Sequence, residues 1–254
     1  MENGAGEIPA EQVSVATERV KPVAPVWHTI ILLVVVVGFS ALNRPQALSH
    51  ANVQPSRLAT YLLTLAYELI LLGYVWLLGL MLYKVPLREI IGGKWRTAKD
   101  FFLDVGIAIL FWFAVAGMLL AVHFLFNFSG VEAAKAMFPQ SGLELSVFVL
   151  LAVFAGFCEE IIFRGYLQRQ FTAWTGNVAA GVALQAIVFG SAHMYQGWKG
   201  VAVISVYGAF FGILAAVCKS LRPGIMQHCT QDAFSGIAVW YAQKHHLLPM
   251  IMRF

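Results

Sequence analysis

The chain has 254 residues, of which 59% are hydrophobic and only 12% are charged, and its mean hydropathy is +0.74. Soluble domains carry about 25% charged residues, so this composition excludes an ordinary soluble enzyme and indicates a protein embedded in a lipid bilayer. The net charge of +4 is modest, and the basic residues stand in short loops between apolar runs. That pattern orients a membrane protein and does not indicate nucleic-acid binding.

The first 22 residues form a polar tail that contains Glu7, Glu11 and Glu18. The tail lacks the basic first region and the apolar second region of a cleavable signal peptide. We therefore expect it to be retained and disordered. Residues 23–254 are expected to form one transmembrane domain without a separate soluble domain.

Seven apolar runs follow the tail, each near or above the length needed to cross a hydrocarbon core of about 30 Å. They cover residues 23–42, 58–83, 101–128, 145–171, 178–194, 201–218 and 225–242. Breaks such as Gly176-Asn177 and Arg222-Pro223-Gly224 separate them. The sequence predicts an all-α polytopic helix bundle with about seven spans, in which the fifth and sixth are close to the lower limit of length.

Basic residues concentrate in the loop between the second and third runs, which holds Lys84, Arg88, Lys94, Arg96 and Lys99. If that loop is cytosolic, eleven lysines and arginines fall on the cytosolic side and six on the other. The excess of basic residues predicts a cytosolic N terminus and, with seven crossings, an external C terminus. We expect an integral membrane protein of the bacterial plasma membrane, in contact with the lipid bilayer.

Two adjacent glutamates, Glu159 and Glu160, stand inside the fourth apolar run. A charged side chain at the centre of a bilayer costs about 2.5 to 3.5 kcal/mol on insertion scales, so such residues indicate a functional site. Glu160 and Arg164 lie four residues apart and can pair within one helical turn, whereas Glu159 lies about 100° around the helix. Two interpretations stay open: Glu159 is a free general base or acid, or both glutamates pair with Arg164 and only fix helix packing.

Two histidines stand in later apolar runs, His193 four residues after Phe189 and His228 four residues before Asp232. Ionisable side chains in lipid face the bundle interior and meet one another, which predicts one catalytic cavity between the fourth, fifth and seventh helices. At 1.5 Å per residue, Glu159 and His193 both lie about 24 to 27 Å from the turn that joins their helices. Counted in the same way, His228 falls about 10 Å short of their level.

Three motifs on three apolar helices, Glu159-Glu160-x-x-x-Arg164, Phe189-x-x-x-His193 and His228-x-x-x-Asp232, resemble the signature of the CPBP family. This family comprises CAAX prenyl proteases of the second type, bacteriocin-processing proteins and Abi proteins, and the resemblance covers about residues 145–242. It implies an intramembrane endopeptidase that acts on a peptide or membrane-protein substrate. The catalytic residues that it implies are Glu159, Glu160, Arg164, His193, His228 and Asp232.

By the same resemblance, Glu159 and His193 activate the water, while His228 and Asp232 face the substrate carbonyl. Asp232 departs from the family pattern, in which an Asn at this position can donate a hydrogen bond to an oxyanion. Three roles stay open for Asp232: a protonated acid, an acceptor that orients His228, or a metal ligand. A Zn²⁺ site would draw on His193, His228, Asp232 and Glu159, but the chain has no HExxH motif, so we favour a glutamate-based mechanism without a metal.

A non-enzymatic function is the alternative: a proton-coupled carrier that uses the Glu and His pairs as a relay, or a catalytically silent scaffold. A carrier predicts discontinuous helices and two related halves, which the sequence does not show. Glu68, in the second apolar run, is expected to support the site, and pairing with Arg164 is its alternative role.

Overall fold

The computed structural model describes residues 20–42, 56–126 and 137–247, and within these ranges every regular element is a helix. In chain order these are α1 (Val26–Leu42), α3 (Arg57–Gly73) with η1 (Tyr74–Leu80), α4 (Leu87–Ile91), α5 (Ala98–Phe126), α7 (Gly142–Glu159) with η3 (Glu160–Leu167) and α8 (Gln168–Thr175), α9 (Val178–Ser191), η4 (Met194–Gln196), α10 (Gly197–Cys218) and α11 (Arg222–Lys244). A helix occupies the described part of each of the seven predicted runs, which confirms the all-α bundle. The predicted disordered tail lies outside the described residues, apart from its last three positions.

Length and apolar composition allow four helices of the described chain to cross a membrane. These are Arg57–Leu80, Ala98–Phe126, Gly142–Thr175 and Met194–Cys218. The helices α1 and α9 are also apolar but shorter, and α11 carries the polar residues of the third motif. The protein is therefore an integral membrane protein, and the side on which its N terminus lies stays a prediction.

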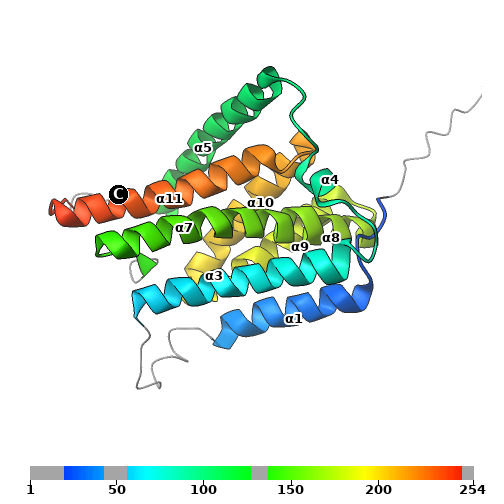
Figure 1. The fold of residues 1–254 in the computed structure, drawn as a ribbon, viewed down its shortest axis with the longest axis horizontal. Coiled ribbons are helices and arrows are strands. Elements are labelled where there is room, and N and C mark those ends of the chain that lie inside the picture. The colour runs from blue at the N-terminus through cyan, green and yellow to red at the C-terminus, as the bar shows by residue number, and fades with distance from the viewer. Residues whose placement is uncertain (1–19, 43–55, 127–136, 248–254) are drawn as a thin grey trace, which may run out of the picture.

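The long helices α3, α7 and α11 lie side by side, with α9 and α10 behind them and α5 leaning away from the others (Figure 1). At one end of the bundle, α3, α7 and α11 extend beyond α1 and beyond the hairpin that α9 and α10 form (Figure 1). Ser40, near the end of α1, donates to the Ala192 carbonyl at 2.9 Å and accepts from the Met194 backbone N–H at 3.1 Å. The helix α1 and the α9–α10 hairpin thus end at the same level, near His193. We call the place where they end and the longer helices continue the step.

Two glycines let α10 pack closely against its neighbours. The Gln185 side-chain amide donates to the Gly208 carbonyl and the Gln168 amide donates to the Gly212 carbonyl, each at 2.9 Å. A Cβ on Gly212 would lie only 2.6 Å from the Gln185 amide nitrogen. Small residues four apart allow such close approach between membrane helices, and here they bring Tyr207 of α10 toward the motif residues.

The helix that begins at Gly142 changes its hydrogen-bond period halfway along. Residues Glu160–Leu167 form a π-helical segment, η3, and all eight of them are buried. A second π-helical segment, η1, lies beside it, where Gly79 packs against the Tyr166 ring. Such segments are rare and are found frequently at functional sites.

Candidate active site

Glu160 and Arg164 form a buried ion pair on η3. Arg164 Nη1 lies 2.9 Å from Glu160 Oε1, and the side chains are 0% and 1% exposed. The guanidinium carbon lies 4.3 Å from the centre of the Phe189 ring and 5.0 Å from that of Phe211, and Nη2 donates to the Gly208 carbonyl at 3.3 Å. The predicted pair is confirmed, and Phe189 of the second motif forms part of the surface on which its cation rests.

His228 of α11 joins this pair to two further carboxylates. Its Nδ1 lies 3.0 Å from Glu160 Oε1, and its Nε2 lies 3.5 Å from Glu159 Oε2 and 3.6 Å from Asp232 Oδ2. Because a carboxylate oxygen lies near each ring nitrogen, the ring is placed to carry both protons. The structure therefore brings five of the six predicted residues, from two helices, into one cluster.

The predicted offset of about 10 Å in the depth of His228 is not observed, because α11 begins deeper in the bundle than the turn after α8. Gly165 of η3 packs against Leu221, which precedes α11, and Gly224 packs against Glu160. The chain continues from η3 through α8 to Thr175, well past this level. A start beside η3 raises His228 to the level of the glutamates.

Exposure rises steadily across the cluster. The side chains are 1% exposed at Glu160, 4% at His228, 14% at Glu159 and 40% at Asp232. Glu160 and Arg164 form the buried side of the cluster, where their charges neutralise each other. Glu159 and Asp232 form its more exposed side. Glu159 is therefore the carboxylate within the pair of glutamates that a water molecule can reach.

His193 lies at the edge of the cluster, just after α9. Its Nδ1 is 2.9 Å from the Phe189 carbonyl oxygen, which can only accept, so Nδ1 carries a proton and a neutral ring would have its lone pair on Nε2. The ring packs against Phe189 at 4.8 Å and Tyr195 at 5.8 Å, and Asp232 lies within electrostatic range. Within the described part of the chain, no hydrogen bond joins His193 to Glu159, and their predicted convergence on one water stays a prediction.

The structure adds side chains that the motifs do not contain. The rings of Tyr207 and Phe211 on α10 lie 5.8 and 5.0 Å from the His228 ring and form an aromatic wall behind it. The Tyr207 hydroxyl is buried and has no hydrogen-bond partner among the described residues. Nothing in the sequence distinguishes a site tyrosine in an apolar helix from an ordinary packing residue, so these two residues were missed.

The structure also bears on the two roles considered for Glu68. Arg164 pairs with Glu160, and Glu68 is instead within electrostatic range of Glu159. Glu68 is 8% exposed, and its Oε2 is buried without a hydrogen-bond partner in the described chain. Pairing with Arg164 is therefore not its role, and the supporting role stays a prediction.

The predicted metal ligands do not form a metal site in the described structure. No three His, Cys, Asp or Glu side chains of the described residues are arranged to hold an ion. Both ring nitrogens of His228 face carboxylates, and one of these, Glu160, already serves Arg164. The residues present do not fit Zn²⁺, and we assign no step to a metal.

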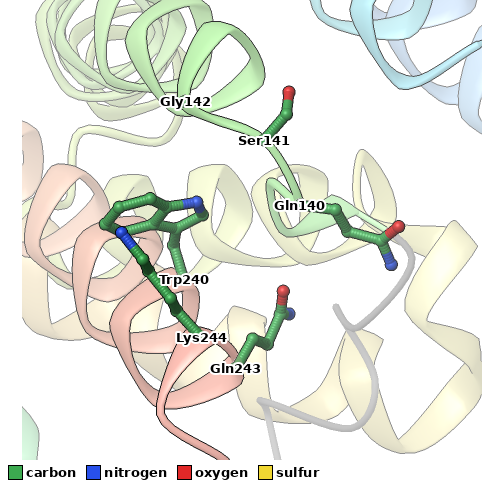
Figure 2. Close-up of a pocket in the computed structure, with 6 residues that line it drawn as sticks. All are labelled: Gln140, Ser141, Gly142, Trp240, Gln243 and Lys244. Atoms are coloured by element: carbon green, nitrogen blue, oxygen red, sulfur yellow. The ribbon is translucent and has the colours of Figure 1, made fainter.

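A hollow of about 340 Å³ lies away from the cluster, between the start of α7 and the end of α11 (Figure 2). Its lining residues are Gln140, Ser141, Gly142, Trp240, Gln243 and Lys244. Glu159 stands at the other end of the 18-residue helix α7, about 25 Å away at 1.5 Å per residue. The catalytic cavity predicted between the fourth, fifth and seventh helices is not this hollow.

Comparison with protein families points to the same part of the chain. A family model described as "Type II CAAX prenyl endopeptidase Rce1-like" matches residues 141–234. Residues 141–234 are therefore similar to the Rce1-like endopeptidases. The matched region begins at the residue that caps α7 and includes all six motif residues, and this similarity supports a protease that acts in a membrane. No curated protein and no solved structure matches the chain.

Proposed function

We propose that this protein is an intramembrane endopeptidase that hydrolyses a peptide bond with a water molecule activated by Glu159. The observation that carries the proposal is the division of labour between the adjacent glutamates. Glu160 is 1% exposed and bound by Arg164, whereas Glu159 is 14% exposed and its Oε2 lies 3.5 Å from His228 Nε2. A carboxylate that no arginine neutralises keeps its lone pairs for a proton from water.

The chemistry follows from the donors and acceptors of the cluster. Glu159 takes a proton from the water while the Nε2 lone pair of His193 orients it, and the water oxygen attacks the carbonyl carbon. The doubly protonated His228 donates to the carbonyl oxygen as it becomes an oxyanion. Glu159 then gives its proton to the leaving amine as the C–N bond breaks.

In this scheme Asp232 accepts from the His228 Nε2–H and orients the ring until the substrate carbonyl takes its place as acceptor. Its Oδ2 lies 3.6 Å from His228 Nε2, and its side chain is 40% exposed. Water around this carboxylate screens its charge, so it repels the oxyanion less than a buried carboxylate would. The role of metal ligand has no support in the donor arrangement, and the mechanism that we propose uses no metal.

The substrate that we propose is a peptide or a membrane protein that reaches the step where α1 and the α9–α10 hairpin end. Asp232, the most exposed member of the cluster, lies within electrostatic range of His193, which lies just after α9. The scissile bond must therefore reach a position between the long helices rather than one at the membrane surface.

The test begins with substrate discovery in native membranes. Peptides released with and without the protein are compared by mass spectrometry, and a released peptide then defines a cleavage assay in liposomes. We expect Glu159→Gln and His193→Ala to lower turnover by about 100-fold to 10,000-fold. Glu89→Gln, at an exposed glutamate of α4, is the matched control.

Unchanged cleavage in both site variants would refute the proposed function. The carrier alternative predicts a different result, in which Glu159→Gln abolishes proton-coupled uptake into liposomes and no peptide bond is cut. A silent scaffold gives neither signal in the intact protein.

A further inference from the structure

Glu68 is a buried acid without a counter-ion. It lies in the middle of α3, is 8% exposed, and its Oε2 is buried with no hydrogen-bond partner among the described residues. Glu159 is the charged group of the described chain that acts on it. Glu68 therefore stands near the reactive carboxylate, on a helix that none of the three motifs includes.

Three other side chains define the space that the two acids share. Tyr67 of α3, Cys158 of α7 and Tyr195 of η4 each lie within electrostatic range of both Glu68 and Glu159. None of the three carries a positive charge. Glu159 thus has the His228 imidazole 3.5 Å away and the buried acid Glu68 within electrostatic range, and these three neighbours add no cation.

This setting decides which acid holds a proton. A buried carboxylate without a cation is costly and takes up a proton instead, and two neighbouring carboxyl groups do not both ionise readily. Glu159 is accessible and its Oε2 lies 3.5 Å from His228 Nε2. Glu68, whose buried Oε2 has no such partner in the described chain, is therefore the neutral member of the pair.

We propose that Glu68 is a positioning residue of the site: its protonated carboxyl faces Glu159 and holds that carboxylate with one oxygen toward His228. Glu68 is buried and does not touch the substrate, so it acts through Glu159. The inference rests on the proposed function for its effect on turnover, but the protonated state of Glu68 is independent of that function.

The first experiment compares Glu68→Gln with Glu68→Leu in the liposome assay. The amide of Gln keeps a donor in place of the protonated carboxyl, whereas Leu fills similar volume and cannot donate. We expect Leu to lower kcat by about 10-fold to 100-fold, the strength of a hydrogen bond to a charged group, with KM unchanged. Gln is expected to restore most of this loss, and the same two substitutions at the exposed Glu89 serve as controls.

The second experiment needs no activity and still decides the question if Glu68→Leu does not fold. The infrared C=O stretch of a protonated carboxyl is measured at neutral pH in the intact protein and in Glu68→Gln, which differ at this one group. We expect the difference spectrum to show a protonated carboxyl that is absent from Glu68→Gln and still present in Glu89→Gln.

Two results would overturn the proposal. One is an infrared spectrum in which Glu68→Gln loses no protonated carboxyl. The other is a Leu variant that folds and turns over as fast as Gln. If the intact protein cuts no peptide while the infrared band is lost on mutation, the proposed function fails and the neutral, buried state of Glu68 stands.

Discussion

His28 and His228 are both buried histidines near η3, at 0% and 3% exposure, but their partners differ in kind. His28 Nδ1 lies 2.6 Å from the Tyr166 hydroxyl, its Nε2 lies 3.2 Å from the Tyr74 carbonyl oxygen, and its ring stacks on Tyr74 at 4.1 Å. Thr29 shares the same hydroxyl at 2.8 Å. Every partner is neutral, and together they fasten α1 to η1 and η3.

His228 instead lies among three carboxylates, one of them paired with Arg164, and two of these reach the accessible side. Burial and a histidine are common to both clusters, so neither of them marks a functional site. What distinguishes the site is excess negative charge beside an imidazole, together with a carboxylate that water can reach. A structural cluster of neutral hydrogen bonds needs neither.

The largest expected effect separates the two histidines by activity. His228→Gln removes the cationic donor and should lower turnover by about 100-fold to 10,000-fold. His28→Gln should leave the turnover of the folded protein unchanged, because its partners are structural. The liposome assay, normalised to folded protein by size-exclusion chromatography, measures both. Equal losses of turnover in the two folded variants would contradict the assignment of His228 to the site and of His28 to a structural cluster.

The next effect is on stability within the site itself. Glu160→Gln leaves the Arg164 charge buried without its counter-ion, and removing one partner of such a pair costs about 3 to 5 kcal/mol of unfolding free energy. Denaturant unfolding in detergent micelles measures the change. At the exposed Glu89, the same substitution should stay within about 0.5 kcal/mol, and a Glu160→Gln value in that range would show that the pair is not buried as described.

A smaller effect is expected in the neutral cluster. Tyr166→Phe removes the hydroxyl that contacts both His28 and Thr29, and leaving a buried polar group unsatisfied costs about 1 to 3 kcal/mol. The same unfolding experiment detects the loss. Turnover of the folded variant should match that of the intact protein, and a large loss of turnover would assign this cluster a part in the site.

The smallest expected effect concerns metal removal. Chelation of divalent cations should leave cleavage unchanged, because the candidate ligands do not form a three-donor set in the described chain. The test measures cleavage activity after dialysis against a chelator and the metal content of the purified protein. Full loss of cleavage that added Zn²⁺ restores would replace the glutamate-based mechanism with a metal-based one.

The helices could be predicted closely because apolar run length and turn residues are local signals. The fourth run was placed at 145–171, and the continuous helix is Gly142–Thr175; the turn predicted at Gly176-Asn177 has a left-handed glycine and a capping asparagine. The Glu160 and Arg164 pair was equally local, since four residues separate the partners. Such features depend on a single helix and need no knowledge of its neighbours.

The rest depends on contacts between distant segments. His28 contacts Tyr166 although 138 positions separate them in the sequence. Neither residue type predicts this contact. The depth of His228 depended on where α11 starts relative to η3, which a count of residues from the nearest turn could not give. The π-helical period of Glu160–Leu167 was also unpredicted, because no residue type in this segment specifies a wider helical period.

That wider helical period makes the number of residues in η3 matter as much as their identity. Glu160 at its start faces α11, and Tyr166 near its end faces α1. Deleting Gly165, which lies between them and outside the motif, would rotate everything downstream by roughly a quarter of a turn. A single-codon deletion here would leave every motif letter intact and yet uncouple the reactive cluster from the anchor of the first helix.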